Sequence, residues 1–190
     1  MTGDFLFFLY FILAAIAVLI VLQPEKFVVT RSAIIDAPPK KVFGLINDLK
    51  KWKYWSPWAE SDPTAQISYS PKTVGRDAQI EWSESKKAGT GSMRLIESIA
   101  YKEIRFNLDL THPFKSNNEV SFSLTPDKNS NGAKTLVVWS IKGSDTFISK
   151  FFNLLISRDK MIGKQFEEGL KSLNLTAQKD HKSLWSFFKF

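Results

Sequence analysis

Six consecutive segments in the middle of the chain alternate apolar and polar residues, the pattern of strands with one buried face. They cover residues 65–70, 76–84, 89–98, 103–111, 118–125 and 134–142, and short turn-forming stretches separate them. Strands joined by connections this short form an antiparallel meander. With an earlier strand predicted over 27–36, we expect one curved sheet of about seven strands, dry on one face and wet on the other.

The dry face needs a cover, and the long amphipathic segment after the last strand provides one. Ser144, Asp145 and Thr146 offer N-caps for a helix that runs to about Ala177. Glycines within it, Gly163 and Gly169, indicate a close approach to the sheet or a bend. A short helix over 39–51 and a turn rich in tryptophan complete the order of an α+β helix-grip fold, with an apolar pocket between the sheet and the last helix.

Residues 5–22 form eighteen consecutive positions without a charge, close to the roughly 20 that a helix needs to cross a membrane. The run lacks the positive start and the cleavage pattern of a signal peptide. We predict three parts: a single-pass transmembrane anchor over 1–25, a folded domain over 26–177 and a basic aromatic tail over 178–190. Basic residues just behind the run favour a cytoplasmic domain.

The tail over 178–190 mixes lysines with aromatic rings, which suits a membrane interface. A tail that packs on its own domain or lacks a fixed structure is the alternative.

The composition excludes several classes of catalytic and metal-binding site. The chain has no cysteine and two histidines, His112 and His181, which excludes a disulfide scaffold, a thiolate nucleophile, a sulfur-ligated zinc site and a three-histidine metal site. No glycine loop of the phosphate-binding type opens a helix, and we predict neither a metal nor a cofactor. The net charge is +7, and the basic residues are scattered along the chain rather than gathered in one run. This pattern favours anionic lipid headgroups over nucleic acid as the partner of the basic surface. Oligomeric state is not readable from these features.

Several blocks resemble the polyketide cyclase/dehydrase-like members of the START-like (SRPBCC) superfamily, and the likeness extends from Val28 to Leu175. They are RSAIIDAPPKKVFGLINDLKKWKYWSPW, GTGSMRLIES, the HPF turn, VVWSIKG and MIGKQFEEGLKSL. The resemblance implies the helix-grip fold and an apolar cavity beneath the last helix. It leaves activity open, because such proteins include lipid carriers, receptors and cyclases.

Two polar residues share the dry parity, Arg31 on the first strand and Glu97 on the third strand of the meander. Burying such groups without a partner is costly. They are predicted to orient the polar head of a ligand, with Glu97 also the one candidate for a catalytic acid or base. The alternative is an ion pair or a position at the rim. The predicted ligand-binding residues are Arg31, Trp55, Trp58, Trp82, Met93, Glu97, Phe106, Phe122, Trp139, Phe151 and Phe166.

The rings of Trp52, Trp55 and Trp58 are expected either to cap the cavity entrance or to be ordinary core that pins the turn to the sheet. The function that the sequence favours is membrane-anchored binding of a hydrophobic small molecule or lipid. Two alternatives stay open: a cyclase- or dehydratase-type enzyme acting on a hydrophobic substrate, and a regulatory domain that binds another protein through its basic face.

Overall fold

The computed structural model describes residues 2–58, 65–85, 89–145, 147–155 and 157–179 of the chain. Its elements follow one another as α1 (Thr2–Val21), β1 (Lys26–Ile35), α2 (Pro39–Ile46), the 3-10 helix η1 (Leu49–Tyr54), β2 (Gln66–Tyr69), β3 (Gln79–Ser85), β4 (Gly89–Ile99), β5 (Glu103–His112), β6 (Ser116–Pro126), the 3-10 helix η2 (Lys128–Ser130), β7 (Thr135–Ser144), α3 (Phe147–Leu155) and α4 (Arg158–Gln178). The predicted α+β order is confirmed.

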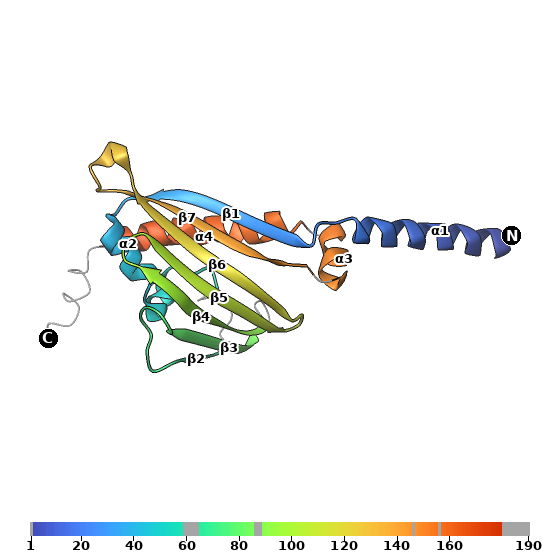
Figure 1. Cartoon of the computed structure of the whole chain (residues 1–190), viewed down its shortest axis with the longest axis horizontal. Helices are drawn as coiled ribbons and strands as arrows, with labels where there is room; N and C mark the ends of the chain where they lie inside the picture. Colours follow the sequence, from blue (N-terminus) through green and yellow to red (C-terminus); the bar gives the residue numbers. More distant parts are fainter. Residues whose placement is uncertain (1, 59–64, 86–88, 146, 156, 180–190) are drawn as a thin grey trace.

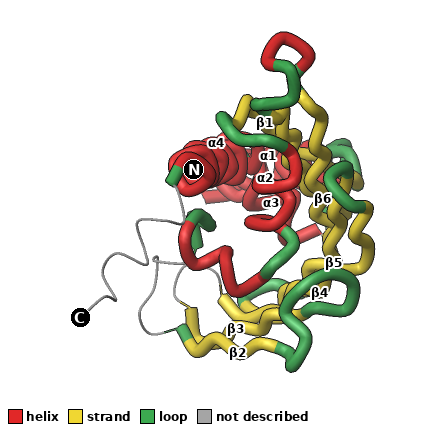
Figure 2. Tube along the Cα trace, turned by 90° about the vertical axis from the view of Figure 1, so that its left-hand side faces the viewer, coloured by secondary structure: helices red, strands yellow, loops and turns green. Residues whose placement is uncertain are grey.

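The seven strands form one antiparallel sheet in the order β1-β7-β6-β5-β4-β3-β2. Figure 2 shows this sheet curling around the helices, from β1 at one edge to β2 and β3 at the other. Its inner face carries the predicted apolar parity, and Leu95, Phe106, Phe122 and Trp139 are completely buried there. The meander and its dry face are therefore confirmed.

Helix α4 lies along the concave face of the sheet (Figure 1). Its buried residues recur every three or four positions and include Phe166, Leu170 and Leu173, which places one helical stripe on the sheet. The rings of Phe166 and Trp139 stack with centroids 4.1 Å apart. A β-carbon added at Gly169 would lie 2.7 Å from the Trp139 ring, so the close approach predicted from this glycine is confirmed.

The C-terminal helix predicted after Ser144, Asp145 and Thr146 does begin at Phe147, but it is not one continuous helix, because the segment forms two helices, α3 and α4. The second begins after Ser157, whose hydroxyl accepts a hydrogen bond from the backbone N–H of Lys160. Ser144 ends β7, and Asp145 forms an ion pair with Arg158. Thr146 lies outside the described residues.

The helix predicted over 39–51 is too long, since α2 ends at Ile46 and η1 follows it. Two indole N–H groups hold this elbow in place. That of Trp52 donates to the carbonyl oxygen of Ile46 at 2.8 Å, and that of Trp55 to the carbonyl oxygen of Leu45 at 3.1 Å. Both rings are buried, so they pin the elbow to the sheet.

Helix α1 extends away from the domain at the end where β1 begins (Figure 1). The predicted N-terminal helix is thus present. Within the part of the chain that the structure describes, no helix is long and apolar enough to cross a membrane. The tail from residue 180 onward, including His181, lies outside the described residues.

Candidate functional site

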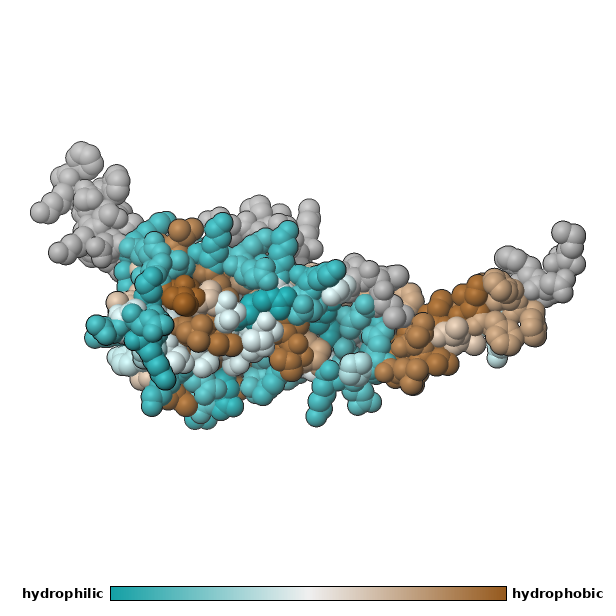
Figure 3. Space-filling model, turned by 90° about the horizontal axis from the view of Figure 1, so that it is seen from above, coloured by the Kyte–Doolittle hydropathy of each residue, from teal (hydrophilic) through white to brown (hydrophobic). Residues whose placement is uncertain are grey.

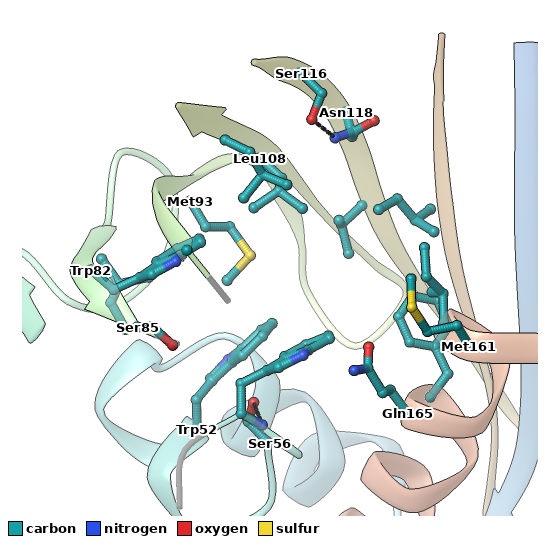
Figure 4. A pocket seen from close by; sticks show the side chains of 18 of the residues that line it. Trp52, Ser56, Trp82, Ser85, Met93, Leu108, Ser116, Asn118, Met161 and Gln165 are labelled. Atoms are coloured by element: carbon teal, nitrogen blue, oxygen red, sulfur yellow. Dashed lines mark hydrogen bonds between the residues drawn. The ribbon is translucent and has the colours of Figure 1, made fainter. Parts of the chain in front are cut away.

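A cavity of about 760 Å³ lies between the concave face of the sheet and the helices α4 and η1. Figure 4 shows side chains from both layers pointing into it: Trp82 and Met93 from the sheet, Trp52 from η1, and Met161 and Gln165 from α4. The space exists because the rings of the core are gathered at one end of the sheet, around Trp55. Farther along, side chains from the two layers line the cavity from opposite sides.

The walls of the cavity are mainly apolar. The strands contribute inward residues at alternate positions, and α4 contributes one helical stripe. They are Ile80, Trp82, Met93, Leu108, Leu110, Val120, Trp139 and Ile141 from the sheet, and Met161, Ile162 and Phe166 from the helix. Such a lining removes apolar surface of a guest from water, which is favourable by about 25 cal/mol per Å².

One end of the cavity is polar. The Asn118 side chain, 5% exposed, donates a hydrogen bond from Nδ2 to the Ser116 hydroxyl at 3.1 Å. Nearby, the Arg158 guanidinium donates to Oδ2 of Asp145 at 2.8 Å and lies 3.9 Å from the centroid of the Phe27 ring. All five residues line the cavity, so its polar end combines one neutral amide with a charge pair that is already neutralised.

Five of the predicted ligand-binding residues line the cavity: Trp58, Trp82, Met93, Trp139 and Phe166. The other aromatic candidates do not. Trp55, Phe106 and Phe122 are buried in the core and contact one another or Trp52 edge to face. They form the packed end of the domain, and the prediction that they contact ligand is corrected.

Arg31 faces inward as predicted but does not line the cavity. Its guanidinium passes beneath α4, donating to Oε1 of Glu167 at 2.8 Å and to both carboxylate oxygens of Asp159 at 3.0 and 2.9 Å. These hydrogen bonds raise the pKa of Arg31 above its ordinary value, and the one from Arg31 lowers the pKa of Asp159. Gly163 leaves the space that the guanidinium fills. Arg31 therefore clamps β1 to α4.

Glu97 lies outside the cavity, which corrects its predicted role. A register shift between Leu95 and Glu97 pairs Glu97 with Arg105 on β5, and the two side chains form an ion pair. Because a β-bulge adds one residue to a strand, it moves the following side chains to the opposite face. The ion pair named as the alternative in the sequence is thus what the structure contains.

Phe151 is also misplaced by the prediction. It lies on α3 and is 42% exposed, beside Phe152, whose ring centroid is 5.4 Å from that of Phe114 in the β5–β6 turn. These three rings do not line the cavity.

Residues 26–178 match the model of a family described as "Polyketide cyclase / dehydrase and lipid transport". The chain belongs to this family. The search of curated proteins found no match. Solved structures share the fold at low identity. One is a protein of Chromobacterium violaceum, with a TM-score of 0.57 and 13% identity over 83% of this chain and 100% of that one. Another is Ara h 8.0201, with a TM-score of 0.54 and 10% identity over 82% and 99%.

The Aha1 dimer from Colwellia psychrerythraea is similar as well, with a TM-score of 0.50 and 16% identity over 78% of this chain and 92% of that chain. At these identities the likeness concerns the fold. What a member of the polyketide cyclase / dehydrase and lipid transport family does must be argued from its own cavity.

The cavity of this family member offers few groups for acid–base chemistry. Asp145 is the one carboxylate among the described lining residues, and Arg158 neutralises it. His112 lines the cavity too. No cluster of three metal-ligating side chains occurs among the described residues.

Asn118 and its neighbour Ser116 are among the polar lining residues that sequence reasoning missed. A signal was present, because Asn118 shares the inward parity of Val120 and Phe122 on β6. An amide at such a position needs a hydrogen-bonding partner inside the fold.

Proposed function

We propose that the chain binds a hydrophobic small molecule or lipid in the cavity between the sheet and α4. The observation that carries the proposal is a cavity of about 760 Å³ with largely apolar walls in a domain whose core is otherwise packed. Ligand sites of folded proteins commonly have about 300–1,000 Å³. Membership of a family whose description includes lipid transport supports the same function.

Filling the cavity is the direct test. Leu108 points into the cavity from β5, and Leu108→Trp would occupy part of it. Leu136 is 37% exposed on the outer face of β7, so Leu136→Trp is a matched control. Mass spectrometry of organic extracts of the purified full chain should detect a bound apolar molecule in the parent and the control and much less in Leu108→Trp. Equal amounts in all three, or none in the parent, would contradict cavity binding.

We further propose that α1 attaches the chain to a lipid bilayer. Its described side chains are apolar, and most are exposed, with Phe7, Phe8 and Tyr10 at 67–70%. Figure 3 shows apolar surface along most of α1. An exposed apolar area of this extent is unusual on a protein surface that faces water, and it indicates contact with an apolar partner such as a membrane.

The exposed rings at the neighbouring end of the domain support the same proposal. Helix α3 carries Phe151 and Phe152, and Phe114 packs on the second. Reciprocal hydrogen bonds tie α3 to the chain just after α1, from Gln23 Nε2 to the Lys150 carbonyl and from Lys150 Nζ to the Gln23 carbonyl. A bilayer that receives α1 would therefore lie close to these rings and to the polar end of the cavity.

Flotation with phosphatidylcholine vesicles tests this attachment. Leu13 and Leu19 on α1 are 57% and 55% exposed, and replacing both by aspartate should strongly reduce flotation, because a charge in the hydrocarbon is costly. Leu136→Asp with Leu175→Asp, at exposed positions of the domain, is the control and should float like the parent. If the α1 variant floated equally well, the attachment would be refuted. A cytoplasmic domain remains part of this proposal, on the basic flank that follows α1.

Glu97, the candidate residue of the enzymatic alternative, pairs with Arg105 on the outer face of the sheet. The regulatory alternative stays a prediction from the basic composition. Neither is favoured by a particular contact in the described structure.

A further inference from the structure

Helix α4 carries a polar, uncharged side chain on its cavity face, that of Gln165. Figure 4 shows this side chain pointing from α4 into the cavity that it lines. The residues four and three positions before it, Met161 and Ile162, and the next residue, Phe166, line the cavity as well and are apolar. An amide among apolar walls is costly unless it forms hydrogen bonds, so Gln165 is an unusual choice at this position.

The Gln165 amide is free and within reach of a guest. Its side chain makes no hydrogen bond with any group in the described part of the chain. The residue is half-buried, and its oxygen and nitrogen are not among the fully buried atoms that lack a partner there. Both atoms therefore keep accessible surface, on a side chain that points into the cavity.

Several other polar side chains of the walls are already engaged or lie in solvent. The Ser56 hydroxyl accepts a hydrogen bond from the backbone N–H two residues later at 3.4 Å. Asp145 and Arg158 form an ion pair with each other. Two further polar residues of the lining are exposed, His112 and Ser144. The amide on α4 is therefore well placed to select a guest.

The charged residues of the described lining do not favour an ionised guest beside this amide. Arg158 lies seven residues earlier on α4, about 10 Å along the helix axis, and Asp145 neutralises it. The Nζ atom of Lys53 lies 4.9 Å from the centroid of the Tyr54 ring, and that residue is 59% exposed and outside the lining. An ionised head would lose its hydration without an opposite charge to replace it.

The chemistry of an amide narrows the guest further. A glutamine side chain presents an oxygen acceptor and N–H donors on one planar group. A guest satisfies both at once if it also carries an acceptor and a donor side by side, as a carboxamide does. An ester accepts but cannot donate, so it leaves the glutamine oxygen unpaired. An ionised carboxylate lacks the donor as well and adds a charge.

We propose that Gln165 selects the guest of the cavity, and that this guest is an uncharged apolar molecule with a carboxamide-like head. The head accepts a hydrogen bond from Nε2 of Gln165 and donates one to Oε1. This inference rests on the proposed binding function and names the class of ligand.

Four probes with one bromoundecyl chain test the inference on the full chain in mild detergent. They are ω-bromoundecanamide, methyl ω-bromoundecanoate, the ω-bromoundecanoate anion and bromoundecane. Bromine quenches tryptophan fluorescence on contact, and Trp52, Trp58 and Trp82 line the cavity, so quenching measures binding. Each affinity is corrected for the partition of the probe into micelles, measured without protein. The amide should bind about fivefold more tightly than the ester, which is the effect of one further net hydrogen bond of about 1 kcal/mol.

Substitutions at Gln165 locate the effect. Gln165→Met should weaken the amide about 25-fold and the ester about fivefold, because two hydrogen bonds and one are lost, and should leave bromoundecane nearly unchanged. Gln165→Leu is a second apolar replacement with the same expectation, and both residues have helix propensities close to that of glutamine. Gln178 is the matched control, since it is exposed near the end of the same helix, bonds to Asp36 and does not line the cavity. Gln178→Met should bind all four probes like the parent.

The outcomes separate this inference from the binding function. Equal binding of amide and ester by the parent chain, tighter binding of the anion than of the amide, or an equal loss of amide and bromoundecane in Gln165→Met would each overturn the inference and leave cavity binding intact. If no probe quenched the parent's fluorescence, the proposed function would fail as well. The ranking of the probes on the parent chain requires no variant to fold.

Discussion

Replacing Gly169 by alanine tests how closely α4 lies on the sheet. A β-carbon at this position would lie 2.7 Å from Cζ3 of Trp139 and 3.0 Å from Cδ of Pro57, whereas carbon atoms rest about 3.5–4.0 Å apart. The Trp139 ring cannot move into solvent, because it is completely buried and stacked on Phe166. The added methyl group must therefore displace either the helix or the ring.

The size of the effect follows from two opposing contributions. Alanine in place of glycine inside a helix stabilises by about 1 kcal/mol, while overpacking a core costs about 1–3 kcal/mol. Gly169→Ala should thus lower the free energy of unfolding by about 0–2 kcal/mol. Gly44 on α2 has no atom within 4 Å of its added β-carbon. Gly44→Ala is therefore the matched control and should raise the free energy of unfolding by about 1 kcal/mol.

Equilibrium urea titration of the full chain in one detergent, followed by tryptophan fluorescence, measures both variants. Their free energies of unfolding should differ by the overpacking cost of about 1–3 kcal/mol, with similar slopes of the urea dependence. If Gly169→Ala were stabilised as much as Gly44→Ala, α4 could not lie on Trp139 as described. Helix α4 would then not form the wall of the cavity opposite the sheet.

Three further outcomes are expected. Gly163→Ala should destabilise the fold by displacing the Arg31 guanidinium, and an Arg31→Ala background should remove most of that penalty, as a double-mutant cycle by urea titration would show. The Arg31 hydrogen bond lowers the pKa of Asp159. The ionised carboxylate therefore stabilises the fold at pH values above its unfolded pKa of about 3.9, and this stability is lost as the pH falls through the lower folded pKa. Urea midpoints of Asp159→Asn should depend less steeply on acid pH than those of the parent, and parallel curves would contradict the role of this pair. Glu97→Gln should leave unchanged the amount of bound apolar molecule that mass spectrometry detects in the purified chain, because the Glu97 carboxylate pairs with Arg105 on the outer face; a large loss of bound molecule would show that Glu97 contributes to the site.

Much of the fold could be predicted because the local periodicity of apolar residues distinguishes strands from helices. Apart from Glu97, the inward parity predicted for β3 to β7 agrees with the structure, with Leu95, Phe106, Phe122 and Trp139 all buried. Boundaries were less accurate. The break between α3 and α4 had a local signal in Ser157, a good N-cap with Asp159 in the first turn behind it, but the apolar pattern across it was continuous enough to favour one helix.

The site was predicted less well. The parity of a strand residue shows which face of the sheet it is on, but not whether a side chain from the opposite layer packs against it. Phe106 and Trp82 share one face of the sheet, yet the first is core and the second lines the cavity. The difference depends on which residues cross the gap from η1 and α4. Glu97 was misplaced for another reason, since a single bulge reverses parity and leaves little trace in the sequence.

The sequence by itself determined the antiparallel sheet, its dry face, the helix that covers that face and the apolar helix at the N-terminus, because each depends on the spacing of side chains along one stretch of chain. The tertiary structure alone decided where space remains between the layers and which residues line that space. Those properties arise when side chains far apart in the chain meet or fail to meet, as Asn118 and Gly143 do at one end of the cavity and Trp139 and Gly169 at the other.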